Sequence, residues 1–348
     1  MQLTYRLPLG FFLPKAAKGD AVLLVRDDGI GDLVYNSAFT VDLLSKAGYD
    51  VYAVVKGGFL EAAKLFLSPD HIIPFDNLLY RASLKYRYEF LSLLRKRGYA
   101  IALGSVIASS VNCDILRYCG ASKRWGYETP LRSFFNYRGI KRVKSIPIIE
   151  SARYLSTLAH ETALLRSAFP EIETTQLLPP RIAKSIEPPR DLALPERYIV
   201  YLSDVGDMRR SYPRDILLPV LAEIAPLPVI VLASKEYEYN GSSFINLTGK
   251  TSLKEAIAIV LNARMVIGNE SGLSHIAHLA DIPTALFLGG GHWGRFLPLS
   301  LSNPLIITRK LDCFCCGWKC KYDDYHFRCI NSDISEVREK LSQFFSAF

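Results

Sequence analysis

The stretch AVLLVRDDGIGDLVYNSAFTVDLLSKAGYDVYAVV, residues 21–55, decides the fold. Its first part, 21–26, is a Val- and Leu-rich run that predicts a buried parallel strand followed by a tight turn. Apolar residues at helical spacing over 33–48 then predict a helix, and 49–55 predicts the next strand. Strand and helix alternate through short links, which indicates a parallel sheet wrapped by helices.

The same alternation continues on both sides of a proline-rich stretch, about 167–195, that has no helical period. This stretch is the linker candidate, because domain boundaries fall in segments of such composition. We therefore expect an α/β protein of two doubly wound, Rossmann-like domains facing a central cleft. Ligands of such sheets bind at the carboxyl ends of the strands.

Length and composition agree with this expectation. A chain of 348 residues suits two domains, and 49% hydrophobic with 22% charged residues is typical of a globular protein. No run approaches the roughly 18 apolar residues that a membrane-spanning helix needs. The apolar N-terminal stretch is short, is broken by prolines and lacks a basic leader, so we expect a cytoplasmic location.

The net charge of +8 limits the partners. A basic excess suits phosphorylated substrates, anionic membrane surfaces or nucleic acid, and it also serves solubility alone. No zinc finger, RNA-binding aromatic pair or long Lys/Arg run is present, so we expect no nucleic acid partner. The amphipathic C-terminal stretch ISEVREKLSQFFSAF allows at most peripheral membrane contact.

The first motif with chemical content is Gly29-Ile30-Gly31-Asp32. The glycines permit a tight turn and close backbone approach, and the helix that follows offers free N–H groups to an anion. Neither the third glycine of a dinucleotide fingerprint nor the Gly-Lys-Ser/Thr of a P-loop follows. The Asp32 carboxylate at such a turn suggests a base that works beside a bound anion. The alternative is a structural turn in which Asp32 caps the helix.

The second motif is VIGNESGLSHIAHLADIPTALFLG, residues 266–289, which reads as strand, polar loop, helix and strand. Ser271 and Gly272 at the helix start supply donors to an anion. Glu270 is placed to accept hydrogen bonds from sugar or ribose hydroxyls. His275 lies one turn inside the helix, within reach of a diphosphate, whereas His278 reads as a packed helix histidine.

Five of the seven cysteines fall between Cys313 and Cys329. Four thiolates at these spacings can enclose Zn or a single Fe tetrahedrally, and such a closed site would be structural. Unligated thiols and disulfides are the alternatives. The predicted metal ligands are Cys313, Cys316, Cys320 and Cys329.

The glycine-rich GGGHWGRFLP, residues 289–298, precedes this cluster at a predicted strand end. Its backbone is placed to line a donor sugar, with His292, Trp293 and Arg295 close by. The alternative is a flexible loop.

Three stretches together resemble glycosyltransferase family 9, which contains the ADP-heptose:lipopolysaccharide heptosyltransferases. They are GIGDLVYNSAFTVDLL, the run from FINLTGK to ALFLG over 244–289, and CFCCGWKC. The resemblance implies a GT-B fold with an acceptor-binding domain over 1–175 and a nucleotide-sugar-binding domain over 176–335. It also implies that the final helix, 336–348, packs back on the N-terminal domain.

The resemblance assigns roles residue by residue. It makes Asp32 the catalytic base and places Arg210, in RRSYP, where the family has a phosphate-binding lysine. Glu270 stands where the family usually has aspartate, and Glu236 matches the ribose-binding acid loosely. The implied donor-binding residues are Gly31, Arg210, Glu236, Glu270, Ser271, Gly272, Leu273 and His275.

These roles predict an inverting glycosyltransferase that moves heptose or a related sugar from an ADP-sugar to a bacterial glycan, with lipopolysaccharide core as the default acceptor. Such an enzyme would work in the cytoplasm or at the inner face of the inner membrane. A protein acceptor and a catalytically idle nucleotide-sugar-binding scaffold are the alternatives. We expect no catalytic metal, because no Asp-x-Asp pair is present. A nicotinamide-dependent oxidoreductase would need the missing Gly-x-Gly-x-x-Gly turn.

Overall fold

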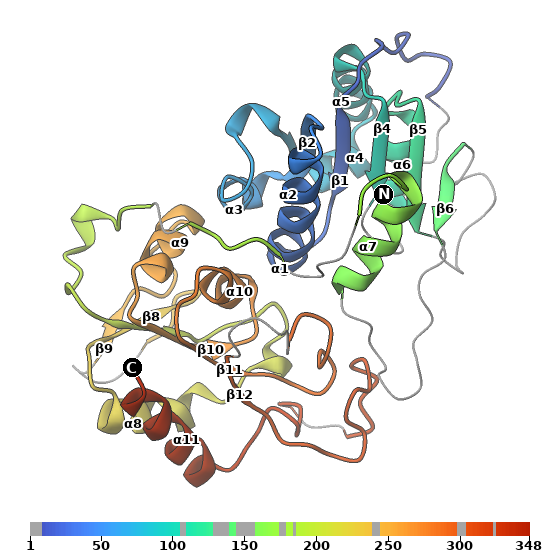
Figure 1. The fold of residues 1–348 in the computed structure, drawn as a ribbon. Coiled ribbons are helices and arrows are strands. Elements are labelled where there is room, and N and C mark those ends of the chain that lie inside the picture. Colours follow the sequence, from blue (N-terminus) through green and yellow to red (C-terminus); the bar gives the residue numbers. More distant parts are fainter. Residues whose placement is uncertain are drawn as a thin grey trace. The chain divides into compact units, whose positions relative to one another are not determined.

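The fold was analysed in a computed structural model of the chain, which divides into two compact units (Figure 1). The first unit contains the described residues up to 143 together with 157–173 and 179, and the second begins at Pro180. The sequence placed this boundary at 175. The structure describes residues 9–104, 109–127, 139–143, 157–173, 179–183, 186–238, 244–297, 304–322 and 325–348.

The first unit is built on a six-stranded parallel sheet of order β3-β2-β1-β4-β5-β6. The central strand β1 is buried throughout, and its Val22 lies opposite Val51 of β2 and Ile101 of β4. Burial on both faces explains why this strand reads as a continuous apolar run. The strands are β1 (Val22–Arg26), β2 (Val51–Lys56), β3 (Ile72–Phe75), β4 (Ile101–Gly104), β5 (Lys123–Tyr127) and β6 (Lys141–Val143).

Helices cover this sheet in the blue-to-green part of the chain (Figure 1). Leu23 and Val25 of β1 share one core with Leu91 of α5 and Ile115 of α6, while α2 and α7 contact the sheet at β2 and β5. The helices are α1 (Ile30–Asp32), the π-helix η2 (Leu33–Ser37), α2 (Ala38–Lys46), η3 (Gly57–Phe59), α3 (Leu60–Ala63), η4 (Pro69–His71), α4 (Asn77–Ala82), α5 (Leu84–Arg97), α6 (Ser110–Tyr118) and α7 (Thr157–Ala168).

The second unit repeats the architecture with the sheet order β12-β11-β10-β7-β8-β9, again all parallel. In β10, Gly268 lies so close to Leu202 of β7 that a Cβ would overlap the Leu202 carbonyl. Only glycine fits at this point of the sheet. The strands are β7 (Ile199–Leu202), β8 (Val229–Leu232), β9 (Phe244–Asn246), β10 (Met265–Asn269), β11 (Thr284–Phe287) and β12 (Leu305–Ile307).

The helices of the second unit pack in pairs, α8 with α11 and α9 with α10. The apolar face of α11 carries Val337 and Leu341, which lie in one core with Leu217 of α8 and Ile307 of β12. The helices are η6 (Arg190–Leu192), η7 (Met208–Arg210), α8 (Arg214–Ile224), α9 (Leu253–Leu261), α10 (Gly272–Leu279) and α11 (Ile334–Ser346).

The predicted class, two α/β domains with parallel sheets, is confirmed, and one local prediction differs from the structure. The final helix packs in the core of the second unit, where the sequence had placed it against the N-terminal domain. An amphipathic pattern predicts that one face of a helix is buried, but it does not predict in which of the two cores. None of the described helices is both long and apolar enough to cross a membrane.

Candidate active site

In the second unit, Asn269 at the end of β10 organises the loops that follow the strands. Its side chain is fully buried, and its Oδ1 accepts a hydrogen bond of 2.8 Å from the backbone N–H of Tyr212. Its Nδ2 donates to the carbonyl of Ser203, beyond the end of β7, at 3.2 Å. One buried amide therefore fixes the loop that carries Arg210 beside the loop that carries Glu270.

Glu270 follows directly and is the centre of a charged cluster. Its Oε1 lies 2.8 Å from His275 Nε2, and its Oε2 lies 2.7 Å from His292 Nδ1. Burial acts to raise the pKa of this carboxyl, but the hydrogen bonds from the two histidines hold it well below its ordinary value. Glu270 is therefore an ionised carboxylate whose two oxygens are both engaged. The sequence had predicted it as an acceptor for sugar hydroxyls, and the structure shows it holding histidines.

Arg210 completes this cluster. Its Nη1 lies 3.9 Å from Glu270 Oε2 and 3.1 Å from His292 Nδ1. His292 Nδ1 cannot donate to the carboxylate and also accept from an arginine, whose side chain only donates. Its N–H donates to Glu270, and the Arg210 guanidinium therefore lies alongside this hydrogen bond. The Arg210 side chain remains 20% exposed, which leaves part of its charge available to a ligand.

The start of α10 lies next to Glu270. Ser271 is the N-cap, and it forms a capping box with Ser274, whose hydroxyl accepts from the Ser271 N–H at 2.8 Å. Within the described residues, the N–H groups of Gly272 and Leu273 make no hydrogen bond, and both residues are half-buried. Free N–H groups at the positive end of a helix are suited to an anion.

His275 differs from its prediction in exposure. Only 1% of the residue is exposed, and its ring packs against Phe296 with the centroids 4.8 Å apart. Its Nε2 is directed to Glu270, so the residue holds the carboxylate from the buried side of the cluster. His278 is buried, as expected of a packed helix histidine. Burial lowers its pKa to about 4, which keeps the ring neutral.

An aromatic side chain that the sequence analysis did not single out forms one wall of the cluster. The Trp318 ring lies 5.0 Å from that of His292, edge to face, and the Arg210 guanidinium lies 5.6 Å from its centroid. The backbone of Trp318 is left-handed, with φ 61°. A Cβ on Gly289 or Gly291 would overlap the Trp318 ring. The glycine-rich loop is therefore a packed surface for this tryptophan.

In the first unit, the turn that carries Asp32 has an unexpected form. Gly29 is the N-cap, Ile30–Asp32 form the first helical turn, and a π-helix follows over Leu33–Ser37. The alternative that Asp32 caps the helix is therefore wrong, because Asp32 already lies inside it. Asp32 is half-buried, and π-helical segments are frequent at functional sites.

A buried arginine supports this turn from beneath. Arg26, 1% exposed, donates to the Asp32 carbonyl at 3.1 Å and to Asp28 Oδ2 at 2.5 Å. Its other terminal nitrogen lies 3.6 Å from Glu161 Oε2, which belongs to α7. The sequence analysis missed this network because Glu161 is remote in the chain. The only signal was a buried strand that ends in charged residues.

Asp28 is the unusual member of that network. Burial raises its pKa to about 7, against the opposing effect of Arg26, and the charges of Asp32 and Asp27 add to the rise. A carboxyl that titrates near neutrality beside Asp32 makes the charge around the turn dependent on pH.

Two predicted donor residues are not among the described contacts of the Glu270 cluster. Gly31 belongs to the first unit, next to Asp32. Glu236 is exposed after the end of β8, and none of the contacts described for the cluster involves it. The structure therefore brings together Arg210, Glu270, Ser271, Gly272, Leu273 and His275 of the predicted set.

The predicted metal ligands are near one another without forming a coordination set. In the part of the chain that the structure describes, no group of three or more His, Cys, Asp or Glu side chains is arranged to hold a metal. The sulfurs of Cys316 and Cys320 nevertheless lie close enough to contribute, after burial, to the raised pKa values of Cys313 and Cys329. No disulfide joins any of the seven cysteines, all of which are described.

Comparison with known proteins agrees with this geometry. Residues 233–315, which carry Glu270 and the helix start, match the sequence model of Glycosyltransferase family 9 (heptosyltransferase). Lipooligosaccharide heptosyltransferase 2 of Haemophilus influenzae is 32% identical over 107 residues, which are 28% of this chain and 29% of that protein. The chain thus matches less than a third of this relative's length.

Solved structures extend the likeness to the whole fold. The E. coli ADP-heptose lps heptosyltransferase II has a TM-score of 0.69 at 13% identity, over 94% of this chain and 99% of that one. Another similar structure is the dodecameric iron-containing heptosyltransferase TibC from enterotoxigenic E. coli, solved with ADP-D-beta-D-heptose. It has a TM-score of 0.57 at 14% identity, over 96% of this chain and 78% of that one. The resemblance found in the sequence is confirmed.

Proposed function

This chain is similar to the heptosyltransferases of glycosyltransferase family 9, and on that premise we propose that it is an inverting glycosyltransferase. It moves heptose or a related sugar from an ADP-sugar donor to a bacterial glycan. The observation that carries the proposal is the Arg210–Glu270–His292 cluster beside the free N–H groups at the start of α10. This arrangement offers positive charge and N–H donors where a nucleotide diphosphate would leave.

In the proposed donor site, the leaving diphosphate rests on Arg210 and on the N–H groups of Gly272 and Leu273. Glu270 balances the arginine charge and fixes the imidazoles of His275 and His292. The carboxylate thus acts by holding its neighbours in place; of these, Arg210 and His292 contact the donor, and the buried His275 supports them from within the unit. Preorganised charge of this kind stabilises a developing anion without rearrangement during the reaction.

Asp32 is the proposed base. It accepts the proton of the acceptor hydroxyl while that oxygen attacks the anomeric carbon and the diphosphate leaves from the opposite face, which inverts the configuration. Arg26 supports this role through the Asp32 carbonyl, without contacting the substrate.

Turnover of an ADP-heptose donor by the Asp32→Asn variant tests this assignment. We expect kcat to fall by about 100-fold or more, while the donor KM stays within about threefold, since general-base catalysis contributes 10²–10⁴-fold. Asp42→Asn, on the exposed side of α2, is the matched control and should keep wild-type kcat. Nearly full turnover by Asp32→Asn with saturating substrates would show that Asp32 is not the base.

The proposed acceptor is lipopolysaccharide core, with a protein acceptor as the alternative in the same chemistry. The net charge of +8 supports an anionic acceptor, and the named relative acts on lipooligosaccharide. Either acceptor fits work in the cytoplasm or at the inner face of the membrane. Labelled donor offered to both acceptor classes in parallel would decide between them.

We also propose a structural role for metal in the cysteine segment. The thiols of Cys313, Cys316, Cys320 and Cys329 have the donor chemistry for Zn or Fe, and TibC is described as iron-containing. Elemental analysis of the purified protein should find about one Zn or Fe per chain, lost in Cys316→Ser/Cys320→Ser. A protein free of metal after aerobic and anaerobic preparation would reject this role.

A further inference from the structure

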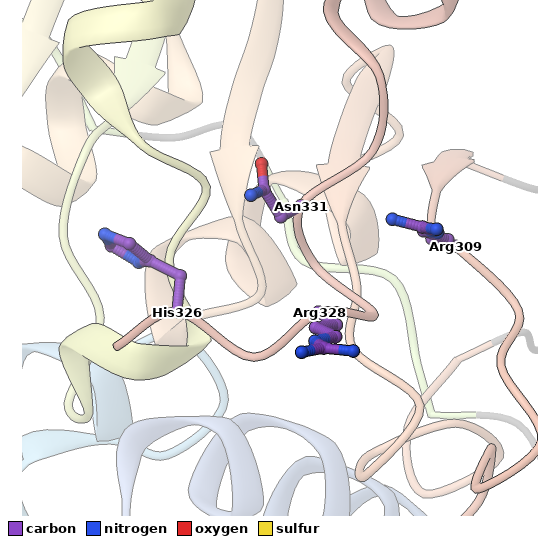
Figure 2. Close-up of a pocket in the computed structure, with 4 residues that line it drawn as sticks. All are labelled: Arg309, His326, Arg328 and Asn331. Carbon is purple, nitrogen blue, oxygen red and sulfur yellow. The ribbon is translucent and has the colours of Figure 1, made fainter. Parts of the chain in front are cut away.

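The C-terminal unit also contains a cavity whose described lining includes none of the residues of the Glu270 cluster. It has a volume of about 380 Å³ and is lined by Arg309, His326, Arg328 and Asn331. Figure 2 shows Arg309 on one side of the opening and His326 on the other, with Arg328 and Asn331 between them. Arg309 follows β12, the edge strand of the sheet, and the other three residues share the loop 325–331.

The walls of this cavity are fixed to the rest of the unit. The backbone N–H of Arg309 donates to the Cys329 carbonyl at 2.9 Å, which joins the strand end to the loop. The N–H of Phe327 donates to the Arg209 carbonyl at 2.9 Å, and its ring stacks on Trp318 at 4.9 Å. The Arg328 guanidinium lies over the Tyr322 ring, 4.4 Å from its centroid. A cavity built in this way needs little ordering when a ligand binds.

The lining has the chemistry of an anion site. Two guanidinium groups, an imidazole and an amide supply hydrogen-bond donors, and none of the four described lining residues is a carboxylate. Arg309 makes no ion pair within the described chain. His326 Nδ1 is buried and has no hydrogen-bond partner there. A buried nitrogen without a partner calls for an explanation, and a bound ligand is one.

We propose that this cavity binds a phosphomonoester, with Arg309 and Arg328 as its charged ligands and His326 and Asn331 as hydrogen-bond partners. A guanidinium group matches the geometry of phosphate oxygens, and this cavity is lined by two of them. The volume lies in the range of small-molecule sites and exceeds what phosphate alone would fill, so a sugar phosphate is favoured over the free ion. The binding does not rest on the proposed transferase activity.

The cavity and the donor cluster are distinct sites that share one wall. Phe327 borders the cavity loop and stacks on Trp318, and Trp318 in turn contacts Arg210 and His292. A ligand in the cavity would therefore lie across this aromatic stack from the proposed diphosphate position.

Calorimetric titration of the full-length protein tests the proposal, with inorganic phosphate and a hexose 6-phosphate as probes. We expect the hexose phosphate to bind more tightly than phosphate, and Arg309→Gln/Arg328→Gln to weaken its binding at least about tenfold. Lys250→Gln/Lys254→Gln removes the same charge from exposed positions of the same unit and should change affinity less than about twofold.

Further variants separate the possible explanations. Arg309→Lys/Arg328→Lys should retain part of the affinity, and thermal melting should confirm that each variant is folded. Arg210→Gln should leave hexose phosphate binding unchanged, because the donor cluster is a separate site. Equal losses in the glutamine pair and the lysine control pair, or no binding of either probe at millimolar concentration, would overturn the proposal. Neither result depends on donor transfer, so failure here and failure of the proposed function are distinguishable.

Discussion

Oε2 of Glu270 lies 2.7 Å from Nδ1 of His292, although the two residues are on different loops of the second unit. The Glu270 side chain spans from His275 on α10 to His292 on the glycine-rich loop. This carboxylate therefore has a structural role. It joins the start of α10 to the loop beneath Trp318.

Glu270→Gln should weaken donor binding and destabilise the fold. The variant removes the charge that both histidines face and leaves buried donors without a charged acceptor, which costs about 1–3 kcal/mol. We expect at least about a tenfold rise in donor Kd and a lower melting temperature. Glu270→Asp should keep one histidine contact, so its donor affinity and melting temperature should lie between those of the wild type and of Glu270→Gln. Wild-type affinity and stability in Glu270→Gln would refute the role given to this carboxylate.

Trp318→Ala should raise the donor KM more than it lowers kcat. The tryptophan positions Arg210 and His292, and cation–π contacts contribute about 0.5–2 kcal/mol, which predicts a rise in KM of about twofold to thirtyfold. Trp318→Phe should restore most of the affinity. Trp293→Phe, on the same loop as His292, is the control for a general loss of aromatic packing.

Gly291→Ala should destabilise the second unit by about 1–3 kcal/mol, because the added Cβ would overlap the Trp318 ring in a packed site. Gly58→Ala is the matched control, since a Cβ there meets no atom within 4 Å. Urea unfolding should show a lower midpoint for Gly291→Ala only. An equal midpoint in both variants would mean that the glycine-rich loop is not a packed surface.

The stability of the first unit should depend on the protonation of Asp28. Its pKa is about 7 in the folded chain against an ordinary 3.8, so the folded state binds more protons than the unfolded state between these values. The contribution to stability is complete below about pH 4 and is lost as the pH rises through about 7, by at most about 1.4 kcal/mol per pH unit.

Asp28→Asn removes this titration and supplies the comparison. The free energy of unfolding of the wild type, relative to Asp28→Asn, should fall between about pH 4 and pH 7 and be level outside this window. Urea titrations at several pH values measure it. Parallel curves across the whole range would show that Asp28 has an ordinary pKa.

The sequence predicted the features that depend on local pattern. Alternating apolar periods predicted both sheets, and the start of α10 at Ser271–Gly272 was predicted from its polar loop. The contacts that complete the sites join residues far apart in the chain, such as Arg26 with Glu161 and Arg210 with Trp318. A single sequence does not record such pairs. The π-helix after Asp32 also has no signature in residue periodicity, because it interrupts the helical period.

Calorimetry with ADP-heptose, ADP, GDP and UDP on the wild type, Arg210→Gln and Lys250→Gln tests the central claim most directly, which is that the Arg210–Glu270 cluster binds an ADP-sugar. The account predicts binding of ADP-heptose and of ADP, weaker binding of GDP and UDP, a loss of at least about tenfold in Arg210→Gln and wild-type affinity in Lys250→Gln. Equal affinity of wild type and Arg210→Gln for ADP-heptose, or no binding of any nucleotide, would contradict it.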